Sequence, residues 1–172
     1  MFPGVALGPN PSETIVDYLG TCAIRVILGV LAISPIARLL NWPQLVQTRR
    51  LVGLWAFFYV AMHFSSYFVF LSELSIDALV LDFVKRPYIT AGILAMSLML
   101  PLVVTSTRKW QLRLGSKWKN IHKLVYVCAI AAWIHLLWVG KGSNFEAFIY
   151  GVILVLLLWE RLKNILRKKR IR

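Results

Sequence analysis

The stretch Lys117 to Trp138, KWKNIHKLVYVCAIAAWIHLLW, decides the fold, because it is an apolar helix that carries two histidines, His122 and His135. An imidazole in hydrocarbon needs a hydrogen-bond partner or a ligand, since burying an unpaired polar group costs free energy. A third histidine, His63, lies in a second apolar stretch, Leu51 to Leu71. Two intramembrane histidines on two helices are therefore available to one ligand.

The composition is typical of a membrane protein, because 59% of the 172 residues are hydrophobic and the mean hydropathy is +0.69. Stretches that can cross roughly 30 Å of hydrocarbon, at about 1.5 Å of helix rise per residue, occur five times. We predict an all-α membrane protein with one domain over residues 1–172, a polytopic transmembrane helix bundle of five spans. The spans are Tyr18 to Leu40, Leu51 to Leu71, Tyr88 to Thr105, Ile121 to Val139 and Phe145 to Leu162.

The basic residues indicate how the chain is oriented. Most of the 20 Lys and Arg lie in the connections 41–50 and 106–120 and at the C-terminus, whereas the other connections hold most of the acids. The positive-inside rule then places the C-terminus in the cytoplasm, with residues 163–172 as a basic tail, and residues 1–17 outside as an extramembrane loop. The net charge of +13 is thus a topology signal with anionic lipid as its partner, and no nucleic-acid role is needed.

Helix geometry predicts that His63 and His135 lie at the same depth. Their spans run in the same direction, and each histidine follows a basic-side residue, Arg50 or His122, by 13 positions, a rise of roughly 19 to 20 Å. Two imidazoles at one depth on parallel helices suit an iron porphyrin held by one axial ligand from each helix. The alternative is that each histidine only donates a hydrogen bond to a carbonyl of the bundle.

His122 lies near the cytoplasmic surface, and a straight helix would turn it about 140° away from His135. A kink, a bulge or a non-helical start would bring it into the bundle, where it would lie near Arg49 or Arg50. This combination suits an anionic group such as a flavin phosphate or a haem propionate, and lipid phosphate is the alternative. Arg25, a charged residue within the first span, is a candidate for binding a haem propionate, with snorkelling to the surface as the alternative.

Three stretches, RRLVGLWAFFYVAMHFSSY, RPYITAG and TSTRKWQLRLGSKWKNIHKLVYVCAIAAWIHLLW, resemble the MsrQ (YedZ) family, haem-binding membrane subunits of the MsrPQ methionine sulfoxide reductase system. This family is part of the wider ferric reductase-like transmembrane group. The resemblance covers residues 18 to 139 and implies haem b, a bound FMN and haem ligands at His63, His122 and His135. The family usually has six spans, so we expect that the first is absent from this chain.

The resemblance further implies that electrons cross a bacterial inner membrane to a periplasmic molybdopterin-containing subunit that reduces methionine sulfoxide in oxidised proteins. Residues 161–172 contain no phosphate-binding glycine motif, so electrons arrive from a quinol or from a separate cytoplasmic flavin reductase. The chain is then an electron-transfer subunit rather than the catalytic one. The alternatives are a ferric reductase or a quinol-linked cytochrome with another acceptor, or a membrane scaffold or transporter without a cofactor.

Overall fold

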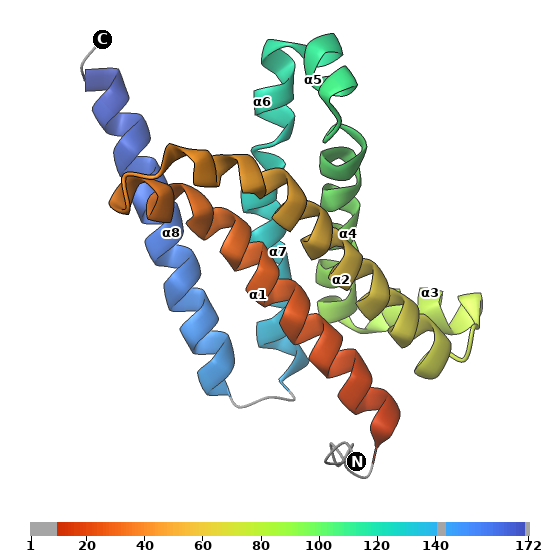
Figure 1. Cartoon of the computed structure of the whole chain (residues 1–172). Helices are drawn as coiled ribbons and strands as arrows, with labels where there is room; N and C mark the ends of the chain where they lie inside the picture. The colour runs from red at the N-terminus through yellow and green to blue at the C-terminus, as the bar shows by residue number, and fades with distance from the viewer. Residues whose placement is uncertain (1–9, 141–143, 171–172) are drawn as a thin grey trace, which may run out of the picture.

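The computed structural model describes residues 10–140 and 144–170, and every element in these ranges is a helix (Figure 1). In chain order the elements are α1 (Pro11–Leu39), the 3₁₀ helix η1 (Pro43–Thr48), α2 (Arg49–Phe70), α3 (Ile76–Lys85), α4 (Pro87–Val104), α5 (Arg108–Leu114), α6 (Ser116–Ile121), α7 (Leu124–Val139) and α8 (Asn144–Arg170). The predicted all-α class is confirmed.

Four of the predicted spans are helices that are long and apolar enough to cross a membrane: Pro11–Leu39, Pro43–Phe70, Pro87–Val104 and Ser116–Val139. The chain is therefore a multi-pass membrane protein. The fifth predicted span, Phe145 to Leu162, lies on α8, where the uncharged stretch is bounded by Glu146 and Glu160. It is shorter than about 20 apolar residues, the length that usually crosses hydrocarbon. The described residues thus give four such helices where five were predicted.

Two predicted segments outside the spans are helical. Residues 1–17 were predicted to be a loop, but α1 begins at Pro11, and proline is favourable at this first position because its missing N–H would be unpaired there anyway. The prediction is wrong from Pro11 onward, and residues 1–9 lie outside the described part. The predicted basic tail continues α8 as far as Arg170, and only residues 171–172 of it lie outside.

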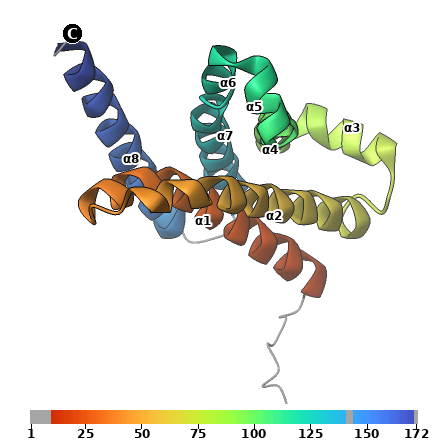
Figure 2. The same ribbon diagram turned by 45° about the horizontal axis from the view of Figure 1, so that its top comes forward.

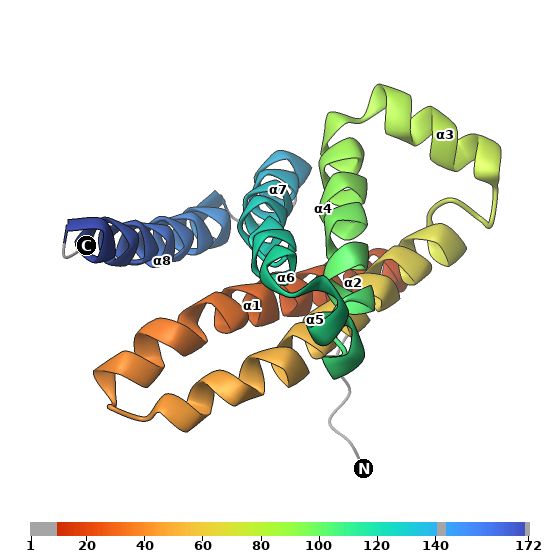
Figure 3. The ribbon, with the colours of Figure 1, turned by 90° about the horizontal axis from the view of Figure 1, so that it is seen from above.

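The bundle is built from two helix pairs, α1 with α2 and α4 with α7, and α8 packs against α7 and α1. Figure 2 and Figure 3 show that α1 and α2 run side by side across the row formed by α4, α7 and α8. Small side chains lie at the centre, and Cys128, which is 1% exposed, donates its thiol to the carbonyl of Ala95 at 3.4 Å. Small residues let membrane helices approach closely. The buried core comprises Ile24, Ile27, Leu28, Leu31, Ala56, Ala95, Met99, Cys128, Ala129, Ala131 and Leu154.

A second close approach joins α7 to α8. The indole N–H of Trp133 donates to the carbonyl of Ala147 at 2.9 Å, and its ring lies over Gly151. A Cβ atom added at Gly151 would lie 2.8 Å from the indole nitrogen. Real Cβ atoms essentially never make contacts this short, so the indole ring or one of the two helices would have to shift.

We expect Gly151→Ala to lower the stability of the purified protein by about 1–3 kcal/mol, the usual cost of overpacking a core. The matched control is Gly29→Ala, because a Cβ at Gly29 has nothing within 4 Å. Alanine there should be neutral or stabilising by up to about 1 kcal/mol, since it favours helix. Thermal unfolding in detergent, followed by helical circular dichroism, compares the two. Equal midpoints would show that this contact does not support the bundle.

Candidate functional site

Two histidines meet between the helix pairs, near the end of the bundle that carries α3. The ring centroids of His63 on α2 and His135 on α7 are 6.0 Å apart, and the ring planes are inclined by 77°. This juxtaposition is the one that the depth comparison predicts. Whether the two rings bind a cofactor stays a prediction, which depends on their hydrogen bonds and on the space around them.

Each imidazole is hydrogen-bonded to the backbone of the helix with which its own helix is paired. Nδ1 of His63 lies 2.9 Å from the carbonyl oxygen of Val16 on α1, and Nδ1 of His135 lies 2.6 Å from that of Tyr88 on α4. Because a carbonyl only accepts, Nδ1 is the donor in both rings and carries the proton. Nε2 is then the nitrogen with a free lone pair, which is the usual state of a histidine that binds a metal.

Glycines make room for both rings. A Cβ added at Gly20 on α1 would lie 2.9 Å from Cε1 of His63, and one added at Gly92 on α4 would lie 2.9 Å from Nδ1 of His135. Each glycine follows the carbonyl residue of its hydrogen bond by four positions, and both hydrogen bonds span 47 residues. Sequence reasoning missed the glycines, although this repeated spacing between glycine and histidine was visible.

The pair fits an iron porphyrin better than a bare metal ion. The two rings, whose centroids are 6.0 Å apart, offer two nitrogen donors, Nε2 of His63 and Nε2 of His135. Within residues 10–140 and 144–170, no three His, Cys, Asp or Glu side chains come together in a way that could hold a metal ion. A porphyrin supplies four nitrogens of its own and needs only these two axial ligands.

A second site lies at the opposite, basic end of the bundle, where α5 and α6 are found. A cavity of about 890 Å³ opens there between α1, α2, α4, α6, α7 and α8. Its wall includes all three residues predicted for a cytoplasmic-side site, His122, Arg49 and Arg50. The described residues that line it include no acid, and the other cations in the wall are Lys119, Lys123 and Arg161. The cavity therefore favours a ligand with an apolar body and a negative charge.

His122 reaches the cavity because the helix is interrupted. α6 ends at Ile121 and α7 begins at Leu124, so that His122 lies in a turn rather than on a straight helix. A straight helix would turn His122 away from the bundle, and this non-helical start brings it in, as one of the predicted alternatives required. The imidazole stacks on Trp118 with a centroid distance of 3.9 Å, and its Nδ1 lies 3.2 Å from the Trp118 carbonyl oxygen. That hydrogen bond again leaves Nε2 with the lone pair.

The arginines differ in what they contact. Arg49 donates to the hydroxyl of Ser34 at 3.2 Å. Arg161 on α8 was not predicted as a site residue, yet its Nε is buried with no hydrogen-bond partner in the described part of the chain. Arg25 is exposed and donates from Nε to the hydroxyl of Tyr150 at 2.7 Å. Its role toward a haem propionate stays a prediction.

A comparison with protein families gives a match over most of the transmembrane part. The model of the ferric reductase like transmembrane component matches residues 19–133, more than half of the chain. The matched segment contains His63, His122 and both glycines, and it ends two residues before His135. No solved structure matches the chain.

Proposed function

The chain belongs to the ferric reductase-like transmembrane family, and we propose that it is a haem-containing electron-transfer subunit of a bacterial inner membrane. Family membership indicates electron transfer within the membrane. The observation that carries the haem assignment is the pair His63 and His135, each with Nδ1 engaged by a carbonyl and Nε2 left with its lone pair. The resemblance to MsrQ supports a role in the repair of oxidised methionine.

The residues would act as follows. His63 and His135 hold haem b, which supplies a one-electron iron couple when bound. With two imidazoles as its protein ligands, the iron would have no position open for a substrate, so the site would suit electron transfer rather than catalysis. Val16 and Tyr88 fix the ring orientation through their carbonyls, and Gly20 and Gly92 provide the space in which the rings lie.

The cavity at the basic end is proposed as the place where electrons enter. Arg49 and Arg50 would bind the phosphate of FMN or another anionic group, with His122 beside it. By the positive-inside rule this end faces the cytoplasm, where a quinol or a flavin reductase would be the donor. His63 and His135 lie close to the other ends of their helices, so electrons would leave to a periplasmic molybdopterin-containing subunit.

The test is electron transfer across a bilayer. Purified protein is inserted into proteoliposomes with a flavin reductase and its reductant inside and the molybdopterin-containing methionine sulfoxide reductase outside. We expect the outer protein to be reduced, and empty liposomes with the same contents to give no reduction. Reduction of an external ferric chelate without reduction of the methionine sulfoxide reductase would favour the ferric reductase alternative. A colourless preparation from haem-replete cells would overturn the haem assignment.

The role of the arginines in the cavity gives a separate prediction. A hydrogen bond to a charged group contributes about 1.5–3 kcal/mol, so Arg50→Gln should weaken the binding of added FMN about tenfold or more. Arg38→Gln is the control, because Arg38 also lies at the basic end but does not line the cavity and pairs with Glu160 at 2.6 Å. Fluorescence titration with FMN measures both variants. Equal affinities in wild type and Arg50→Gln would exclude Arg50 from the site.

A further inference from the structure

α3 is an amphipathic helix whose apolar side is not covered by the rest of the protein. Its sequence, IDALVLDFVK, places Ile76, Val80 and Val84 four residues apart, which at about 100° per residue puts them on one side. These side chains are 68%, 56% and 75% exposed. The sequence predicted only a connection between spans here, so α3 is an element that the proposed function does not use.

The position of α3 is fixed by short links and by polar contacts. Only residues 71–75 separate it from α2, and Arg86 alone separates it from α4. Asp82 accepts a hydrogen bond from the hydroxyl of Tyr67 on α2 and pairs with Nε of Arg86 at 3.1 Å. The hydroxyl of Thr90 on α4 donates to the carbonyl of Phe83 at 2.8 Å. The helix is thereby held at the level where α2 ends and α4 begins.

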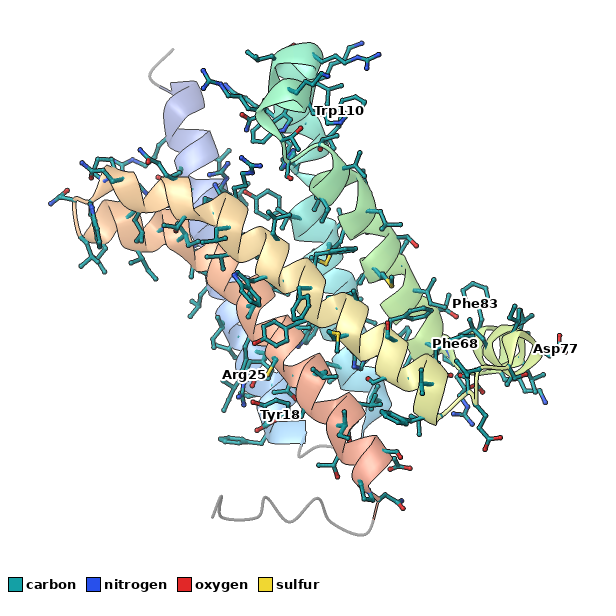
Figure 4. All side chains as sticks on the ribbon, turned by 45° about the vertical axis from the view of Figure 1, so that its right-hand side comes forward. Tyr18, Arg25, Phe68, Asp77, Phe83 and Trp110 are labelled. Carbon is teal, nitrogen blue, oxygen red and sulfur yellow. The ribbon has the colours of Figure 1, made fainter. Side chains whose placement is uncertain are left out.

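The orientation of α3 indicates what covers its apolar side. Figure 1 shows α3 lying across the end of α4 and projecting sideways from the bundle. In Figure 4, Phe83 points from α3 toward the level of the spans, whereas Asp77 points away from the bundle. Exposed apolar residues continue from α3 onto the spans, with Phe70 at the end of α2 and Leu94 on α4 being 45% and 51% exposed. Surfaces of this kind on spans face lipid.

We propose that α3 is an interfacial helix, inserted with Ile76, Val80 and Val84 into the boundary between head groups and acyl chains of the leaflet at this end of the bundle. An amphipathic helix with its axis in the membrane plane buries its apolar side about 5–10 Å deep in that boundary. The exposed charges at this end are mixed, because Glu73 and Asp77 are acidic while Lys85 and Arg86 are basic. No excess of positive charge draws the helix to anionic lipid, so the partner is a zwitterionic lipid surface. This inference does not depend on haem binding.

The test is site-directed spin labelling of the full chain in nanodiscs of phosphatidylethanolamine and phosphatidylcholine. Cys22 is replaced by serine and the buried Cys128 is retained, and single labels are placed at Val80→Cys, Val84→Cys and, on the opposite side of the helix, the exposed Lys85→Cys. Leu94→Cys is the control for lipid exposure and Glu73→Cys is the control for water exposure. Relaxation by oxygen, which partitions into lipid, is compared with relaxation by a water-soluble nickel chelate.

We expect labels at 80 and 84 to be relaxed more by oxygen than by the chelate, as at 94, and the order to be reversed at 85, as at 73. If labels at 80 and 84 match the one at 73, the apolar side faces water, and the inference is wrong. That outcome would instead leave the apolar side available to a protein partner. Unchanged elution and helical circular dichroism of each labelled variant show that it has folded.

Discussion

Replacing His63 or His135 with alanine is expected to lower the haem content of the purified protein about tenfold or more, because each variant removes one of two axial ligands. The two substitutions should have similar effects, since the two rings lie in equivalent positions, each held by a carbonyl 47 residues earlier. Haem per protein is measured by the pyridine haemochrome absorbance, and the Soret and α bands report the ligation state.

His122→Ala is the matched control for these variants. It removes a histidine that lies just before α7, stacks on Trp118 and lines the cavity at the basic end rather than the space between the helix pairs at the other end. We expect this variant to keep the spectrum of the haem between His63 and His135. If His63→Ala and His135→Ala both retain the wild-type spectrum, the ligand assignment is wrong.

Gly92→Ala is expected to reduce haem binding about tenfold although it removes no ligand, an effect of the size seen when the hydrogen-bonded surroundings of a metal ligand are altered. The added Cβ would lie 2.9 Å from Nδ1 of His135, the nitrogen that donates to Tyr88. The ring would have to turn or move, and Nε2 would then no longer point along its present direction. Gly20→Ala should act on His63 in the same way.

The control for Gly92→Ala is Gly29→Ala, which introduces the same methyl group into a helix at a position with nothing within 4 Å. Haem content and the midpoint potential are measured for both variants in parallel. If Gly29→Ala keeps the wild-type haem content while Gly92→Ala loses haem, the loss is caused by the contact between the added Cβ and the imidazole. Identical haem content and potential in the two variants would show that the ring has room to accommodate the added atom.

The apolar stretches predicted the spans well because burial in hydrocarbon imposes long helices with few charges. The pairing of His63 with His135 also followed from residue counting, since helix rise is regular. The fifth predicted span, Phe145 to Leu162, includes Glu146, Glu160 and Arg161, and these charges shorten the apolar part of α8. α1 extends to Pro11 beyond its apolar stretch, which hydropathy alone does not indicate.

Features that depend on contacts between helices were not predictable in the same way. The equal spacing of Gly20 from His63 and of Gly92 from His135 is visible in the sequence, but spacing alone does not show that a ring packs on a glycine, so the close approach emerged from the packing. The predicted cytoplasmic-side site required a break in the helix at His122. The structure has this break between α6 and α7. Arg161 was not predicted as a site residue, because only the packing of α8 against α7 places it in the cavity wall.

The most direct measurement of the central claim, that His63 and His135 bind one haem iron between the two helix pairs, is the electron paramagnetic resonance spectrum of the purified ferric protein. Two axial imidazoles make the iron low-spin, so we expect a low-spin ferric haem signal that is lost in both His63→Ala and His135→Ala. A haem-free preparation from haem-replete cells, or a ferric haem that is only high-spin in the wild type, would contradict the claim.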